Sequence, residues 1–130
     1  MEQLSELARL FESHDDMAVS INDGCVTVVS DDGIEIYLTP GSAQLIAETV
    51  LFSKSDVTDV NALNDLILES HQFVPLASIG TRYIGDATYY IAFGALSMDS
   101  KDEVIVEEVE ALFASVPEFL DLYKHYLKEV

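Results

Sequence analysis

The sequence predicts an α+β fold: a five-stranded, mainly antiparallel, twisted sheet with three helices, in the chain order α-β-β-β-α-β-β-α. Helical periodicity occurs in three separate segments, and alternating runs rich in β-branched residues lie between them. Asn-Asp-Gly and Asp-Asp-Gly turns mark the ends of these runs. A length of 130 residues is typical of one domain, so we expect a single domain over residues 1–130.

The first helix is expected over residues 2–13, because apolar side chains recur there at helical spacing. These side chains are Leu4, Leu7, Ala8 and Phe11. The strands "CVTVVS" at 25–30 and "IEIYLT" at 34–39 follow, each preceded by a turn. A third strand at 44–53 completes an antiparallel meander.

A second helix is predicted over residues 59–71, followed by strands at 73–85 and 88–97. Pro75 lies near the beginning of the fourth strand, where a missing N–H is tolerable. The C-terminal helix follows, and the segment "SKDE" at 100–103 fits a capping box with Ser100 as the cap. We expect Pro117 to kink this helix or to split it in two.

The fifth strand contains "YYIAFGALS" at 89–97, nine residues without a charge. Tyr89 and Phe93 point to one side, and Tyr90 and Leu96 point to the other, so neither face has the polar character of a solvated strand. Three helices are expected to cover only one face of the sheet. The other face is therefore predicted to meet a second copy of the chain, with Gly94 admitting a close neighbour. A central strand covered by two helices of the same chain is the alternative.

Composition excludes several function classes. The chain carries 24 acidic and 6 basic residues, a formal net charge of −18, which disfavours nucleic acid and anionic membranes as partners. No apolar run is long enough for a membrane span, so we expect no direct membrane insertion, and Cys25 as the only cysteine suits the cytoplasm. A basic protein partner would instead be attracted electrostatically.

No catalytic motif is evident in the sequence. The histidines at 14, 71 and 125 lie far apart, and Cys25 has no basic neighbour that would activate its thiol. Glu48 is expected to face solvent or a subunit contact. We therefore predict a protein that is not an enzyme and that needs no metal or cofactor.

Three features of the sequence resemble the YjfI-like family of bacterial proteins: "PLASIG" at 75–80, "YYIAFGALS" at 89–97, and the acidic helix that follows. The resemblance implies a fold similar to that of type III secretion chaperones, which are small, acidic and usually dimeric. It also implies a genomic neighbourhood with proteins like phage-shock protein A, a membrane-stress scaffold. The family has no assigned activity, so no functional residue can be carried over from it.

The function predicted from these observations is that of a non-catalytic, cytoplasmic, homodimeric protein-binding module, similar to a chaperone or adaptor, whose partner is unknown. The candidate contacts with that partner, or with the second subunit, are Tyr89, Tyr90, Phe93, Gly94, Leu96, Phe119 and Tyr123. The alternative is a small-molecule-binding protein or small enzyme with a pocket lined by Tyr83, Tyr89 and Tyr90.

Overall fold

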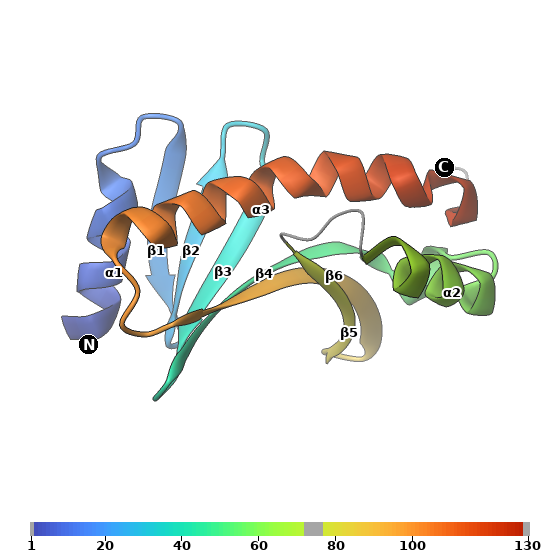
Figure 1. Ribbon diagram of the computed structural model, residues 1–130, viewed down its shortest axis with the longest axis horizontal. Helices are drawn as coiled ribbons and strands as arrows, with labels where there is room; N and C mark the ends of the chain where they lie inside the picture. The colour runs from blue at the N-terminus through green and yellow to red at the C-terminus, as the bar shows by residue number, and fades with distance from the viewer. Residues whose placement is uncertain (1, 72–76, 129–130) are drawn as a thin grey trace.

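The structure is a computed structural model that describes residues 2–71 and 77–128. Figure 1 shows its elements in chain order. They are α1 (Glu2–Glu12), β1 (Met17–Asn22), β2 (Cys25–Ser30), β3 (Glu35–Pro40), β4 (Gln44–Ser53), η1 (Lys54–Asp56), α2 (Val60–Ser70), β5 (Ser78–Ile84), β6 (Ala87–Ser97), α3 (Asp102–Tyr123) and η3 (Lys124–Tyr126). The α+β class and the order of the predicted elements are therefore confirmed, but the number of strands is not.

Within the described residues the sheet has six strands, in the order β1-β2-β3-β4-β6-β5, and every neighbouring pair is antiparallel. The prediction of five strands is wrong because it missed β1. This strand forms a hairpin with β2, in which Asn22 pairs with Cys25 across a two-residue turn. Asp23 and Gly24 both have positive φ, of 48° and 81°, as a type I′ turn requires.

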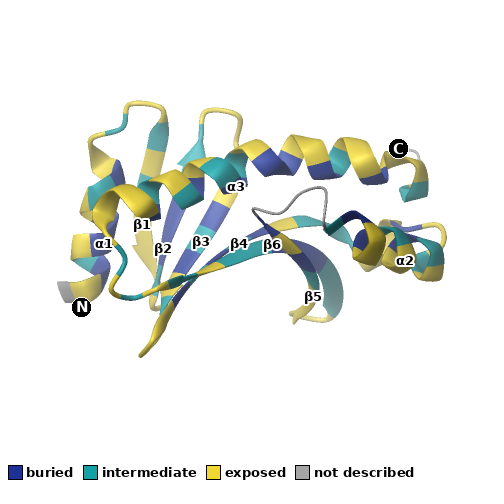
Figure 2. Cartoon of the chain, viewed as in Figure 1, coloured by how far each residue is buried: buried dark blue, intermediate teal, exposed yellow. Residues whose placement is uncertain are grey.

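The three α-helices of the described chain pack on one face of this sheet. Alternate residues of the central strands point toward them and are almost fully buried. This buried set comprises Val26, Val28, Ile36, Leu38, Leu45, Ala47, Tyr90 and Ala92. In Figure 2 the buried positions of α3 lie along the side that faces the sheet, and its opposite side is exposed. The core therefore lies between the helices and one face of the sheet.

The beginning of α3 differs from the prediction. Lys101 occupies the N-cap position without a side-chain cap, and its carbonyl accepts the first helical hydrogen bonds, so Ser100 is not the cap. Pro117 lies inside one continuous helix and does not split it. Pro117 is exposed, whereas Val116 and Phe119 beside it are buried in the core. Burial of the adjacent residues compensates for the missing N–H of Pro117.

The fourth predicted strand, 73–85, corresponds to β5 at its C-terminal part. Pro75 and the other residues before Ala77 in that prediction lie outside the described residues. His71, the C-cap of α2, accepts a hydrogen bond at Nε2 from the N–H of Ile79, at 3.2 Å. This contact connects the end of α2 to the edge strand β5.

Candidate protein-interaction surfaces

The face of the sheet opposite the helices is not covered by any described helix. We call its central part the open face. Its side chains are those of Tyr37, Ile46, Glu48, Val50, Tyr89, Ile91, Phe93, Ala95 and Arg82, which the strand register places on one side. Val50 is 41% exposed, whereas Ile91, beside it on β6, is only 5% exposed. The open face is thus a mainly apolar surface in a strongly acidic protein.

One ion pair lies within this apolar surface. Arg82 Nη2 of β5 is 2.7 Å from Glu48 Oε2 of β4, and the Glu48 side chain is only 17% exposed. The two groups are close enough for charge attraction, although Oε2 receives no well-aligned hydrogen bond from any described residue. The pair cancels its own charge at the centre of the open face, and the nearest carboxylate on the same side of β3 is that of Glu35, which accepts a hydrogen bond from Tyr37. Glu48, expected to face solvent or a subunit contact, lies on the uncovered side but is largely buried.

Only two of the seven predicted contact residues lie on the open face, namely Tyr89 and Phe93. The Phe93 ring extends over Gly80, close enough that a Cβ at Gly80 would be 3.2 Å from it. Gly94 and Leu96 point to the helix-covered side. The other three, Tyr90, Phe119 and Tyr123, are buried in the core of the chain, which leaves them no surface to offer a partner. Helical and strand periodicity identified apolar positions, but it could not distinguish residues buried in the core from residues available for contact with a partner.

The predicted tyrosine pocket does not form. Tyr90 is buried on the helix-covered side, where its hydroxyl donates to Asn64 Oδ1 at 2.6 Å. Tyr89 lies on the open face, and Tyr83 is 69% exposed. Instead, Tyr89 lines a shallow cavity of about 440 Å³ together with Tyr37, Cys25 and Glu48. The strand register, which the sequence alone does not specify, decides this grouping.

The chemistry available at these surfaces is limited. Tyr37 donates a hydrogen bond to Glu35 Oε2 at 2.7 Å, and this bond, with burial, raises the pKa of Tyr37 to about 12. The Cys25 thiol is half-buried. Among the described residues, no group of three His, Cys, Asp or Glu side chains could hold a metal ion. No helix in residues 2–71 and 77–128 is long and apolar enough to cross a membrane.

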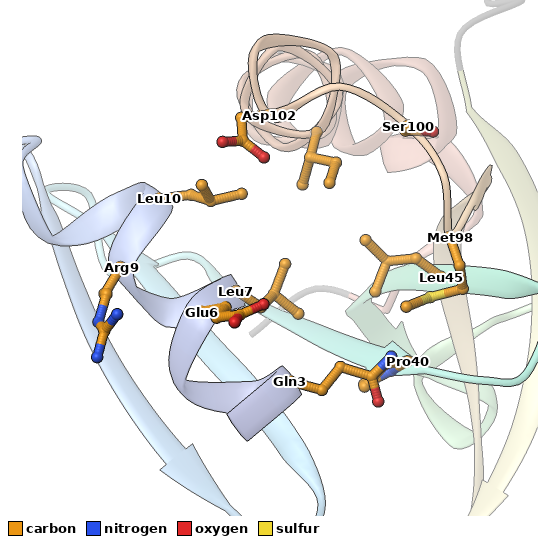
Figure 3. A pocket seen from close by; sticks show the side chains of 11 residues that line it. Gln3, Glu6, Leu7, Arg9, Leu10, Pro40, Leu45, Met98, Ser100 and Asp102 are labelled. Carbon is orange, nitrogen blue, oxygen red and sulfur yellow. The ribbon is translucent and has the colours of Figure 1, made fainter. Parts of the chain in front are cut away.

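A second surface is the groove between α1 and the beginning of α3, which Figure 3 shows from close by. Its volume is about 500 Å³. Apolar side chains from both helices, from β4 and from the segment after β6 form its floor, with Pro40 of β3 beside them: Leu7, Leu10, Leu45, Met98 and Ile105. Gln3, Glu6, Ser100 and Asp102 form its rim. Sequence reasoning missed this groove because it joins residues nearly one hundred positions apart in the chain.

The chain is similar to known proteins in sequence and in fold. Residues 1–127 match DUF2170, a family described as "Uncharacterized protein conserved in bacteria". The uncharacterized protein YjfI of Escherichia coli K12 is 29% identical over 93 residues, which cover 72% of this chain and 70% of YjfI.

Two solved structures are similar in fold. YbjN of E. coli, a proposed transcription regulator, aligns with a TM-score of 0.70 at 10% identity, covering 98% of this chain and 96% of YbjN. A chain of the HopA1–SchA chaperone–effector complex aligns with a TM-score of 0.64 at 14% identity, covering 91% of this chain and 94% of that one. At such identities the likeness shows the fold alone. It is the fold that the secretion-chaperone resemblance implied.

Proposed function

This chain belongs to the DUF2170 family, and on that premise we propose that it is a non-catalytic, cytoplasmic homodimer that binds another protein. The fold supports a binding role, because a chain of similar fold occurs in a chaperone–effector complex. A single free cysteine in a chain of 130 residues suits a reducing compartment. A link to membrane stress rests only on the family resemblance in the sequence.

The observation that carries the proposal is the open face. The described α-helices pack mainly on the other side of the sheet, and the apolar side chains of Ile46, Val50 and Phe93 remain partly exposed. Protein interfaces are enriched in aromatic residues and arginine and are depleted in other charges at their centre. The open face has this composition, with Tyr37, Tyr89 and Phe93 around one internal ion pair.

The occupant that we propose for the open face is a second copy of the chain. Two-fold homodimers are the commonest soluble oligomers, and two such faces can pack as sheets about 10 Å apart. Charge supports this arrangement. The chain carries a net charge of −18, yet the Glu48–Arg82 pair cancels the charge at the centre of the open face. Two copies can therefore meet there with little repulsion, whereas other acidic surfaces of the molecule would repel each other.

Light scattering on the purified protein tests the dimer. We expect a mass of twice 14.3 kDa at micromolar concentration. Val50→Lys places a long charged side chain in the centre of the open face and should shift the mass to that of one chain, because removing the ammonium group from water in a packed interface is costly. Leu68→Lys is the matched control, since Leu68 is 72% exposed on α2, away from the open face. A wild-type mass of 14.3 kDa would refute the dimer.

A further inference from the structure

We infer that the groove between α1 and the beginning of α3 binds a short segment of a partner protein that carries aliphatic side chains flanked by Lys or Arg. This inference rests on the proposed protein-binding function and names the chemistry of the partner. The groove is defined by its floor (Leu7, Leu10, Leu45, Met98 and Ile105) and its rim (Gln3, Glu6, Ser100 and Asp102).

The floor of the groove selects apolar side chains. Leu7, Leu45 and Ile105 are buried, whereas Leu10 and Met98 are half-buried and remain accessible. In Figure 3 Leu10 projects from α1 into the space below α3, and Met98 and Leu45 close the opposite side. A volume of about 500 Å³ lies within the usual range of binding pockets, roughly 300–1,000 Å³. The groove can therefore admit a few aliphatic side chains but not a whole domain.

The rim selects the charge of the occupant. Glu6 on α1 and Asp102 in the first turn of α3 are both exposed at the edge of the groove. Arg9 is the one cationic residue among the described residues that line the groove, and in Figure 3 its guanidinium points away from the space. A helix N-terminus often attracts anions, but here Asp102 and Glu103 already occupy the first turn of α3. The rim therefore favours Lys or Arg and disfavours an acidic or phosphorylated segment.

A second copy of this chain does not fit that charge preference. The chain has 24 acidic and only 6 basic residues, so most of its segments would be repelled by Glu6 and Asp102. The groove also lies on the helix-covered side of the sheet, because Leu45 belongs to the core set. It is thus separate from the open face. Dimer formation and segment binding can be tested independently.

The probe is a random peptide library displayed on phage, selected on the immobilised full-length protein. We expect the enriched peptides to combine aliphatic residues with Lys or Arg. Binding of one selected peptide to purified variants is then measured by fluorescence anisotropy. Leu10→Asp should weaken binding by about tenfold or more, because a carboxylate would replace an apolar contact. Leu68→Asp is the matched control on an exposed leucine of α2 and should leave binding unchanged.

A charge variant keeps the test valid if Leu10→Asp does not fold. Glu6→Gln with Asp102→Asn changes only exposed side chains, so the fold should persist. This double variant should bind the peptide more weakly at low salt, and its affinity should change less as the salt concentration rises. An acidic consensus, no enrichment over background, or binding that ignores both variants would overturn the inference. Val50→Lys should retain peptide binding, and Leu10→Asp should retain the dimer mass, so failure of the groove and failure of the dimer are distinguishable.

Discussion

Gly94 of β6 lies directly beneath Glu108 of α3: a Cβ atom at Gly94 would stand 2.8 Å from Glu108 Oε1. The neighbour that Gly94 admits is therefore the protein's own C-terminal helix, and not a second copy of the chain as the sequence suggested. The contact is made by the end of a flexible side chain. The space above Gly94 is consequently adjustable, which gives the first prediction.

Gly94→Val should lower the free energy of unfolding by about 1–3 kcal/mol, because the added isopropyl group must displace the Glu108 side chain or shift α3. Gly94→Ala should cost less, since the Glu108 carboxylate can swing away. Urea denaturation measures both changes. Adding Glu108→Ala to Gly94→Val should recover part of the loss. No recovery would mean that the backbone of α3, and not the Glu108 side chain, limits the space.

The hydroxyl groups of Ser70 and Tyr123 form a buried hydrogen bond of 2.9 Å between α2 and α3. Ser70 Oγ also donates to the carbonyl of Ile67, so its single proton is used there and Tyr123 is the donor in the pair. Ser70→Ala should destabilise the protein by about 1–3 kcal/mol, since it leaves the buried Tyr123 hydroxyl without this partner.

The double variant Ser70→Ala with Tyr123→Phe should be little less stable than Ser70→Ala alone, because it removes both polar groups. Urea denaturation of the full cycle gives the coupling. Ser42→Ala, at an exposed position in the turn between β3 and β4, is the control. Additive losses for the two single variants would contradict the proposed bond.

Alkaline pH should destabilise the protein through its tyrosines. The hydrogen bond to Glu35, with burial, raises the pKa of Tyr37 to about 12, and burial also raises the pKa values of Tyr90 and Tyr123. Tyrosine in the unfolded chain ionises near pH ~10, so above this pH the unfolded state releases protons that the folded state retains. The contribution of these tyrosines to the free energy of unfolding should be constant below pH ~10 and should fall as the pH rises toward about 12.

Tyr37→Phe should make that fall shallower. Denaturant unfolding at several pH values between about 9 and 12 measures the slope. Tyr83→Phe is the matched control, because Tyr83 is 69% exposed. Equal slopes for Tyr37→Phe and wild type would show that Tyr37 does not contribute.

Salt should stabilise the fold. The net charge of −18 produces mutual repulsion, and the described residues contain only two ion pairs, Glu48–Arg82 and Asp121–Lys124. Screening shortens the range of this repulsion to about 8 Å at ~0.15 M ionic strength. The melting temperature should therefore rise from low to physiological NaCl, while binding of a basic partner slows. A falling melting temperature together with faster binding would mean that attractive ion pairs dominate.

Local patterns predicted most of the elements. The helices over 2–13 and 59–71 agree with α1 and α2 within a residue or so, and the strand at 44–53 agrees with β4. The missed strand β1 has its apolar residues Met17, Val19 and Ile21 at alternate positions, but its other positions are small or polar. The sequence Asn-Asp-Gly at 22–24 nevertheless predicts a turn. A two-residue turn before a strand implies a partner strand on its other side, and that inference would have found β1.

The sequence by itself determined the fold class, the acidic surface and the uncharged character of residues 89–97. Those properties depend on spacing and composition, which are local. The tertiary structure decided which side of that strand is core. Because both sides are apolar, the pattern cannot distinguish them. α3 packs over Gly94 and α2 contacts Tyr90 on one side of the strand, whereas Phe93 lies on the open face. The groove between α1 and α3 likewise forms only because the fold brings Leu10 and Ile105 together, although most of the chain separates them in sequence. The spacing of neighbouring residues cannot predict such a long-range arrangement.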